Sequence, residues 1–201
     1  GTAKRNWDEF ASVLGITGPW EVRFQSGRGA SEKFSFTQLA DWSKHSDKGV
    51  RHFSGVATYQ TTFVANPKSE IRNPKWVLDL GRVEVMARVK LNGKDMGTVW
   101  KSPFRVEVTK ALKTGENQLE IEVANLWPNR LIGDERLPDD GIRDGKWPGW
   151  LLENKPRTSG RFTFVTHRHY TKDSPLLKSG LIGPVTIMRH KIGSAAGRER
   201  V

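Results

Sequence analysis

The sequence predicts an all-β fold, an antiparallel β-sandwich with one or two short helices, and two observations support this prediction. Apolar and polar residues alternate along much of the segment 56–123, which is typical of antiparallel sheets with one solvated face. The dipeptide Asn92-Gly93 lies between two such runs, and this pair is the strongest short signal for a β-hairpin. Several alternating strands joined by tight turns favour a sandwich.

The strands are expected in sequence order, beginning with 18–24 (GPWEVRF) and 32–39 (EKFSFTQL). The β-branched and aromatic residues of VATYQTTF then open the central run. The clearest alternation places Leu119, Ile121 and Val123 on one face and Glu120 and Glu122 on the other. Further strands are expected in 75–81, 83–91, 104–112, 161–170 (RFTFVTHRHY) and 180–190 (GLIGPVTIMRH).

Helix is expected only in two short segments, 6–15 with Asn6 as its N-cap and 39–45. The stretch 125–158 lacks strand patterns, and a loop of this length in a compact domain is usually functional or partly structured. No repeat or linker divides the chain. We therefore expect one domain over residues 1–193, followed by a flexible tail at 194–201.

The chain has 201 residues, a net charge of +11 and no cysteine. A chain of this length can bury a core without covalent staples, and the lack of cysteine excludes disulfides and thiolate metal sites. No apolar run approaches the length needed to cross a bilayer. A basic surface attracts polyanions such as nucleic acid, anionic lipid or acidic polysaccharide, although the charge can also serve solubility alone.

Residues 56–125 carry an ordered set of motifs: DLG, A-x-V-x-LNG, G-x-VW, PF and G-x-N-x-L-x-I-x-V-x-N. In this order they resemble the sugar-binding jelly-roll domain of glycoside hydrolase family 2. The later segments NLWPNRLIGDE and SGRFTFVTHRHYTKDSPLLKSGLIGPVTI resemble the C-terminal region of large bacterial glycosidases such as family 106 rhamnosidases. The resemblance implies a galactose-binding-like jelly roll that accompanies a catalytic barrel and is not itself catalytic.

The polar loop 124–150 concentrates three of the eight tryptophans beside arginines. Proteins hold sugars with an aromatic platform and a few planar hydrogen-bonding groups, and arginine pairs bidentately with carboxylate or sulfate. The candidate ligand-binding residues of this loop are Trp127, Asn129, Arg130, Arg143, Trp147 and Trp150. Alternatively, the tryptophans plug an open end of the sandwich, and Arg130 pairs with Asp134 or Glu135 to hold the loop.

Acidic residues also cluster in this loop, and clustered carboxylates suit calcium. The candidate ligands of a structural calcium ion are Asp134, Glu135, Asp139 and Asp140, with Asp144 close by. Their spacing does not match an EF-hand loop, so a solvated acidic loop is the alternative, and no motif requires a cofactor. Glycoside hydrolysis needs two carboxyl groups at a set separation, and the sequence shows no such pair.

His167 and His169 lie two residues apart in the predicted strand 161–170, so we expect their side chains on one face beside Tyr170. A pair of this spacing can bind zinc, but a third ligand is needed and none is evident nearby. Two interpretations remain. The histidines are surface residues beside Tyr170, or they contact a ligand together with Tyr170 at the end of the sandwich.

Two functions follow from these patterns. The first is a non-catalytic carbohydrate-binding module, ancillary to a bacterial polysaccharide-degrading glycoside hydrolase, with a preference for acidic (uronate or sulfated) or rhamnose-containing glycans. The alternative is a purely structural domain that packs on a glycosidase catalytic barrel without its own ligand. The aromatic loop is the least basic part of the chain, which argues against a nucleic-acid groove. We expect a secreted or periplasmic parent enzyme, with no signal sequence in this chain and no membrane partner.

Overall fold

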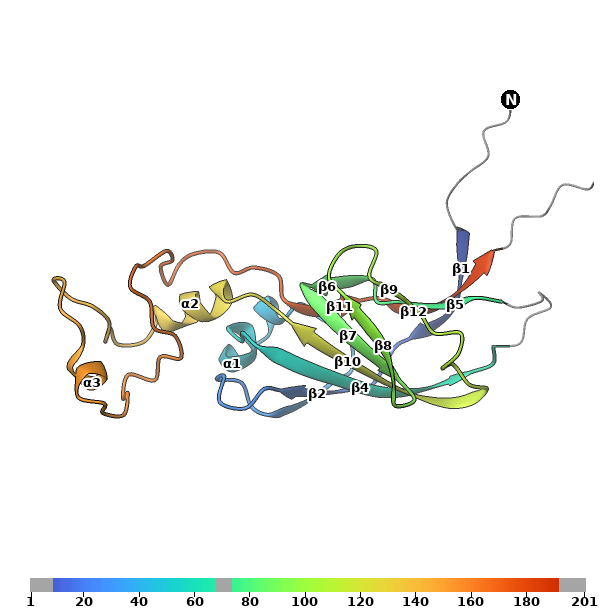
Figure 1. Ribbon diagram of the computed structural model, residues 1–201, viewed down its shortest axis with the longest axis horizontal. Helices are drawn as coiled ribbons and strands as arrows, with labels where there is room; N and C mark the ends of the chain where they lie inside the picture. The colour runs from blue at the N-terminus through green and yellow to red at the C-terminus, as the bar shows by residue number, and fades with distance from the viewer. Residues whose placement is uncertain (1–8, 68–73, 192–201) are drawn as a thin grey trace, which may run out of the picture.

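The computed structural model describes residues 9–67 and 74–191, which form a β-sandwich (Figure 1). One sheet has the strand order β1 (Glu9–Ile16), β12 (Val185–Lys191), β5 (Trp76–Asp79), β9 (Arg105–Glu107). The second sheet has the order β3 (Lys33–Phe36), β2 (Trp20–Phe24), β4 (Val56–Ala65), β10 (Gly115–Ala124), β7 (Met86–Leu91), β8 (Lys94–Val99). A short separate pair consists of β6 (Arg82–Glu84) and β11 (Gly180–Gly183). All these strands pair antiparallel, so the predicted fold class is confirmed.

The core lies between the two sheets and is built from the apolar face of each strand. Leu119, Ile121 and Val123 of β10 are buried, as their period-two spacing predicts. The largest side chains of this core that are almost completely buried are Trp20, Trp42, Phe53, Tyr59, Leu78, Leu80 and Leu91. The core therefore closes without help from the tryptophans of the loop 124–150.

The predicted hairpin at Asn92-Gly93 joins β7 to β8. Both residues have positive φ, 52° and 77°, which is the geometry that a tight two-residue hairpin turn requires. The Asn92 side chain also donates hydrogen bonds to the Ala111 carbonyl and to the Asn117 side chain, 2.8 Å each. This turn is therefore anchored to β10 itself and to the segment that precedes it.

The helix predicted for 6–15 is wrong over its described part, because residues 9–16 form β1. Pairing with β12 satisfies the backbone of this segment, and the tertiary contact overrides the weak local helix signal. The proposed cap, Asn6, lies outside the described residues. The second predicted helix is present as a single turn, η1 (Trp42–Lys44), capped by Asp41, and a short α1 (Lys48–Arg51) follows it.

The strand predicted for 161–170 is also wrong, because this segment joins neither sheet. Two of its backbone N–H groups, those of Phe162 and Thr163, donate to the Asp134 carboxylate instead of to a neighbouring strand. The strand predicted for 180–190 is confirmed as β11 and β12, which are separated at Pro184.

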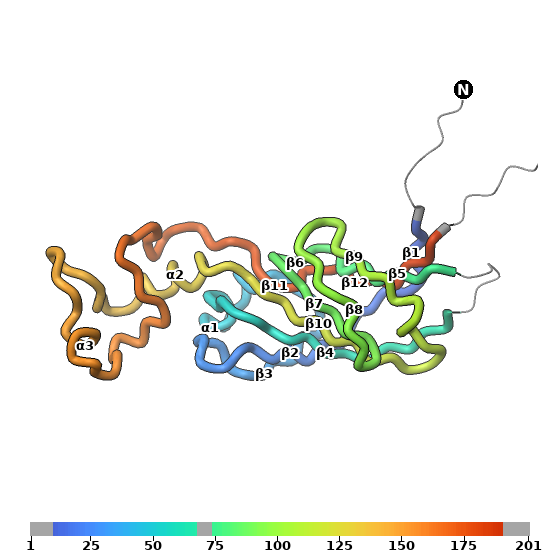
Figure 2. Tube along the Cα trace, viewed as in Figure 1, coloured from blue at the N-terminus to red at the C-terminus, as the bar shows by residue number. Residues whose placement is uncertain are grey.

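Residues 125–179 leave the sandwich at the end of β10 and return at β11, and we call this excursion the arm. It contains α2 (Pro128–Asp134) and α3 (Gly149–Leu152). Figures 1 and 2 show that the arm projects from one end of the sandwich, with α3 near its tip. The strand-poor stretch expected at 125–158 is therefore real, and it is longer than the sequence pattern suggests.

Among the described residues, no helix has the length and apolar character needed to cross a membrane. The predicted tail, 194–201, lies outside these residues, so the single-domain boundary at residue 193 stays a prediction.

Candidate functional site

The base of the arm is held by a buried carboxylate. Asp134 is 1% exposed, and its Oδ2 accepts hydrogen bonds from the backbone nitrogens of Phe162 and Thr163 at 2.9 and 2.7 Å. The Thr163 hydroxyl donates to the same oxygen at 2.7 Å. Arg130 forms an ion pair with the other carboxylate oxygen, Nε to Oδ1 3.0 Å. Asp134 therefore joins the outgoing and returning halves of the arm.

Two of the candidate ligand-binding residues are buried and bonded within the protein. Arg130 is 6% exposed, and its guanidinium lies 4.8 Å from the centroid of the Phe162 ring. Asn129 is 2% exposed and exchanges two hydrogen bonds with the backbone of Leu177, its Nδ2 donating at 2.7 Å and its Oδ1 accepting at 2.8 Å. The alternative in which Arg130 pairs with Asp134 is the one that the structure shows.

The acidic residues predicted as calcium ligands do not come together in the described part of the chain. Within the described segments, no group of three or more potential ligands gathers into a cation site. Each carboxylate pairs with an arginine instead. The pairs are Asp134 with Arg130, Glu135 with Arg161, Asp139 with Arg168 and Asp140 with Arg157. An arginine beside each acid neutralises the charge that a calcium ion would need.

Asp140 and Arg157 form a bidentate pair. Two hydrogen bonds from Arg157 and one from Ser159 lower the pKa of Asp140 to about 2. The pKa of Asp139 is also lowered, first by the backbone N–H of Gly141 and then by Arg168. Both carboxylates favour the ionised form, so the arm stays charge-paired at neutral pH.

The tip of the arm contains a small aromatic cluster. Trp147 stacks on Phe164 with ring centroids 5.9 Å apart, and Trp150 meets the edge of the same ring at 5.8 Å. Trp150 is fixed further, because its Nε1 donates to the Asp140 carbonyl at 2.9 Å and the Arg157 guanidinium lies over its ring. Trp147 is 49% exposed, so it presents a supported but accessible ring.

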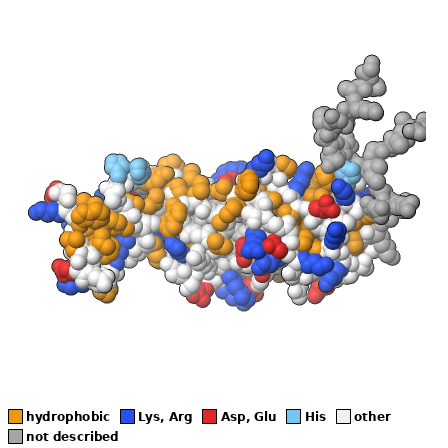
Figure 3. All heavy atoms as spheres, viewed as in Figure 1, with side chains coloured by type: hydrophobic (Ala, Val, Ile, Leu, Met, Phe, Trp, Pro, Cys, Tyr) orange, Lys and Arg blue, Asp and Glu red, His pale blue; other side chains and the backbone are white. Residues whose placement is uncertain are grey.

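None of the three loop tryptophans plugs the sandwich. Trp127 is 46% exposed and lies against the guanidinium of Arg28, 5.2 Å from its ring centroid. Trp147 lies two residues before α3 and Trp150 lies within it, and Figure 1 shows α3 at the far tip of the arm. Figure 3 shows apolar side chains gathered at this tip. The exposed large apolar residues of the arm are Leu126, Trp127, Trp147, Leu151, Leu152, Phe162 and Leu177.

The remaining candidates are distributed around the arm. Arg143 is exposed, and its Nη2 donates to the Asp139 carbonyl at 2.8 Å. The rings of His167 and His169 lie edge to face with centroids 4.8 Å apart, both exposed, beside a half-buried Tyr170. Because 161–170 is not a strand, the two histidines approach each other through a bend and not through period-two alternation.

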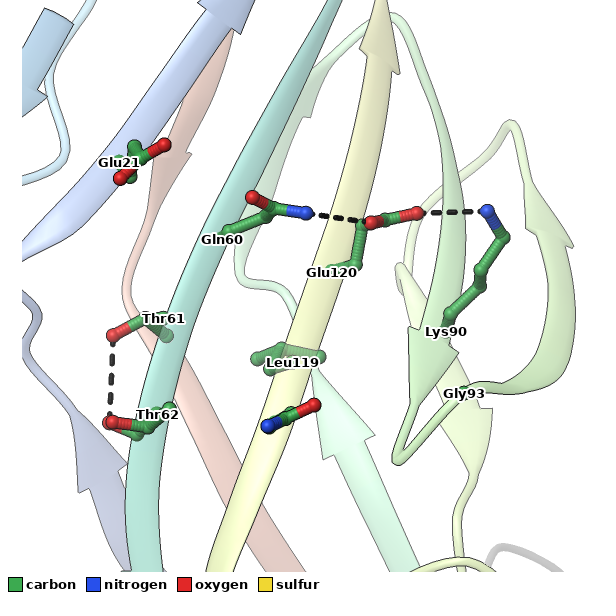
Figure 4. Close-up of a pocket in the computed structure, with 9 residues that line it drawn as sticks. Glu21, Gln60, Thr61, Thr62, Lys90, Gly93, Leu119 and Glu120 are labelled. Carbon is green, nitrogen blue, oxygen red and sulfur yellow. Dashed lines mark hydrogen bonds and ion pairs between the residues drawn. The ribbon is translucent and has the colours of Figure 1, made fainter.

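A second polar site lies on the outer face of the six-stranded sheet, which no sequence motif indicates. Four side chains form a row across neighbouring strands: Glu21 on β2, Gln60 on β4, Glu120 on β10 and Lys90 on β7. Glu120 accepts from Gln60 Nε2 at 2.8 Å and from Lys90 Nζ at 2.7 Å (Figure 4). These residues line a hollow of about 420 Å³.

Comparison with known proteins gives a consistent set of relatives. Residues 42–159 match the family model for the glycosyl hydrolase 2 galactose-binding domain-like family. A putative beta-glucuronidase of Formosa agariphila is 49% identical over 176 residues, which is 86% of this chain and 15% of the relative. The rhamnosidase of Novosphingobium sp. PP1Y is 37% identical, with a TM-score of 0.72 over 94% of this chain and 16% of that chain.

A more distant solved structure shares the fold alone. The beta-glucuronidase of an uncultured Clostridium sp. is 17% identical, with a TM-score of 0.55 over 94% of this chain and 30% of that chain. The present chain thus spans about a sixth of the length of its two more similar relatives.

Proposed function

The chain belongs to the family of glycosyl hydrolase 2 galactose-binding-like domains, and on this premise we propose that it is a non-catalytic carbohydrate-binding domain of a larger glycoside hydrolase. The observation that carries the proposal is the Trp147 ring, which is supported on one side by Phe164 and half exposed to solvent. A rigid indole of this kind is what a weakly apolar sugar face needs as a platform.

Acidic or rhamnose-containing glycans are the ligand class that we favour. Arg143 and Lys146 form a short backbone bridge directly before Trp147, and both side chains are exposed. A basic rim beside an aromatic platform suits a uronate or sulfated sugar, since a guanidinium binds carboxylate or sulfate with two parallel hydrogen bonds. The names of the two more similar relatives, a glucuronidase and a rhamnosidase, point to the same glycans.

The experiment is a titration of the chain with an oligogalacturonate of four residues, at low and high salt. We expect Trp147→Ala to weaken binding by about tenfold or more, which corresponds to about 1.4 kcal/mol. Trp100→Ala is the matched control, because Trp100 is 68% exposed on the sandwich and lies outside the arm. Equal affinity of the two variants for the oligogalacturonate would contradict the proposal.

A purely structural role on a catalytic barrel is the second candidate, and one observation favours it. Seven of the twelve exposed large apolar residues of the described chain lie on the arm. Apolar surface gathered on one projecting element is typical of a protein–protein contact. This role would be supported if the wild type bound the parent catalytic domain but no saccharide, and if Leu152→Asp abolished the binding of that domain.

The expected compartment follows from the proposed substrate. A domain that helps to degrade an external polysaccharide belongs to a secreted or periplasmic enzyme, and detection of the parent enzyme in the culture medium or periplasm of its host would test this.

A further inference from the structure

The outer face of the six-stranded sheet differs from an ordinary solvated face because its polar row is ordered. Glu120 lies between two partners on neighbouring strands, Gln60 on β4 and Lys90 on β7. All three side chains are only half exposed. Strand register therefore fixes a carboxylate, an amide and an ammonium group side by side before any ligand arrives.

The hollow above this row is present because the residues around it are small or have planar amide side chains. Thr62 and Gln118 stand opposite each other on β4 and β10, and both line it together with Gly93 of the β7–β8 turn. Gly93 has no side chain to fill the space. The volume of about 420 Å³ falls within the range of small-ligand sites, roughly 300–1,000 Å³.

The charges lining the hollow are already matched. Glu21 pairs with Arg23 at 2.9 Å and with Lys33 at 3.1 Å, and Glu120 pairs with Lys90. The hollow therefore offers hydrogen-bonding capacity without an excess charge to attract an ion. An acidic sugar would bring a negative charge beside Glu21 and Glu120, which is unfavourable unless a cation is added.

We propose that this hollow is a second binding site, for a neutral saccharide, with Gln60, Gln118 and Glu120 as its hydrogen-bonding groups. An ionised carboxylate can accept about four hydrogen bonds, and Glu120 uses two of them within the protein. Hydroxyl groups of a sugar supply donors for the rest, while the amides of Gln60 and Gln118 both donate and accept. The inference rests on the proposed function only for the class of its ligand.

The test is a calorimetric or NMR titration with neutral tetrasaccharides of galactose, glucose and rhamnose. At least one is expected to bind the wild type, and Gln60→Leu and Glu120→Gln are each expected to weaken that binding about fivefold to tenfold, as the loss of about one hydrogen bond implies. Glu107→Gln is the matched control, since Glu107 is an exposed carboxylate on β9 of the other sheet. Melting curves check that each variant folds.

The outcomes separate this site from the arm. Neutral saccharide binding that survives Trp147→Ala but falls in both sheet-face variants supports the inference. Absence of neutral saccharide binding by the wild type, or unchanged affinity in both folded variants, overturns it. If no neutral saccharide binds but oligogalacturonate binding still depends on Trp147, only this inference fails. If only neutral saccharides bind and their binding depends on Gln60, only the proposed arm site fails.

Discussion

Arg157 holds the Asp140 carboxylate with two hydrogen bonds, from Nε to Oδ2 at 2.6 Å and from Nη2 to Oδ1 at 2.7 Å. The same guanidinium donates to the Thr163 carbonyl and lies over the ring of Trp150. One bidentate pair thus connects the outgoing and returning halves of the arm to its aromatic tip.

Acid should loosen the tip of the arm through this pair. The pKa of Asp140 in the fold, about 2, is below its ordinary value of 3.8, so the stability that the pair contributes is present above pH 3.8 and is lost as the pH falls towards 2. Asp139, whose pKa is also lowered, acts in the same direction. We expect the protection of the Trp150 indole N–H against hydrogen exchange, measured by NMR relative to the intrinsic rate at each pH, to fall over this range.

Asp140→Asn is the comparison for that experiment. At pH 6 its indole N–H should already exchange faster than in the wild type, and less further change should follow on acidification. An exchange rate at pH 6 equal to that of the wild type would show that Arg157 does not hold the tip through Asp140.

Asp134→Asn should detach the returning half of the arm. The substitution leaves the buried Arg130 without its charged partner and turns a pure acceptor into an amide facing two backbone N–H groups. Removal of one member of a buried pair costs about 3–5 kcal/mol. Urea unfolding should report this loss, and exchange of the Phe162 and Thr163 amides should locate it.

Asp144→Asn provides the control for that substitution. Asp144 is exposed and has a positive φ of 50°, which asparagine tolerates well. Its free energy of unfolding should stay close to that of the wild type. A loss of similar size in both variants would mean that the burial of Asp134 is not the cause.

Tyr59→Phe should destabilise the sandwich core. The Tyr59 hydroxyl accepts from Trp42 Nε1 at 2.7 Å and from the Leu181 backbone nitrogen at 3.2 Å. Without it, two buried donors lose their acceptor, at about 1–3 kcal/mol for each unsatisfied group. Urea unfolding should show a lower midpoint with an unchanged slope, whereas an unchanged midpoint would contradict this account.

Burial also raises the pKa of the Tyr59 phenol, so the fold favours its neutral form. The resulting stability is present below the unfolded-state pKa of about 10 and is lost as the pH rises above it. In a Tyr170→Phe background, which leaves Tyr59 as the only tyrosine, phenolate absorbance should rise only together with unfolding. Phenolate formation in the folded protein near pH 10 would disprove this.

Gly49→Ala should disrupt the contact between α1 and the 27–31 loop. A Cβ atom at this position would lie 2.1 Å from the Gly29 carbonyl oxygen and 2.9 Å from Ala30 Cα, and both are backbone atoms that cannot rotate away. Overpacking of this kind costs about 1–3 kcal/mol or more. Gly15→Ala, where no atom lies within 4 Å of the new Cβ, should leave the melting temperature unchanged or raise it slightly.

Much of the sandwich could be predicted because its signals are local. The buried row Leu119, Ile121 and Val123 follows directly from period-two alternation, and the Asn92-Gly93 turn needs only those two residues. The segment 161–170 shows the limit of this reasoning. It alternates like a strand, but a strand also needs a partner, and here Asp134 takes the backbone N–H groups of Phe162 and Thr163.

The candidate sites depended even more on long-range contacts. Arginines and acids in one loop could equally form a ligand cradle, a calcium site or an internal network, and only their pairing in space decides among these. Arg157 was not among the predicted site residues, because it lies in a segment, ENKPRTSGR, that carries no motif.

The sequence by itself determined the fold class and the positions of most strands, because alternation and turn residues act within a few residues of each other. Its ordered motifs indicated the family by resemblance. Only the tertiary structure decided that Asn129 and Arg130 are buried supports while Trp147 is accessible. It also decided that Gln60, Glu120 and Lys90 form one row, because three strands distant in sequence must first pair in register. Burial and register are properties of the assembled sheets, and no single segment encodes them.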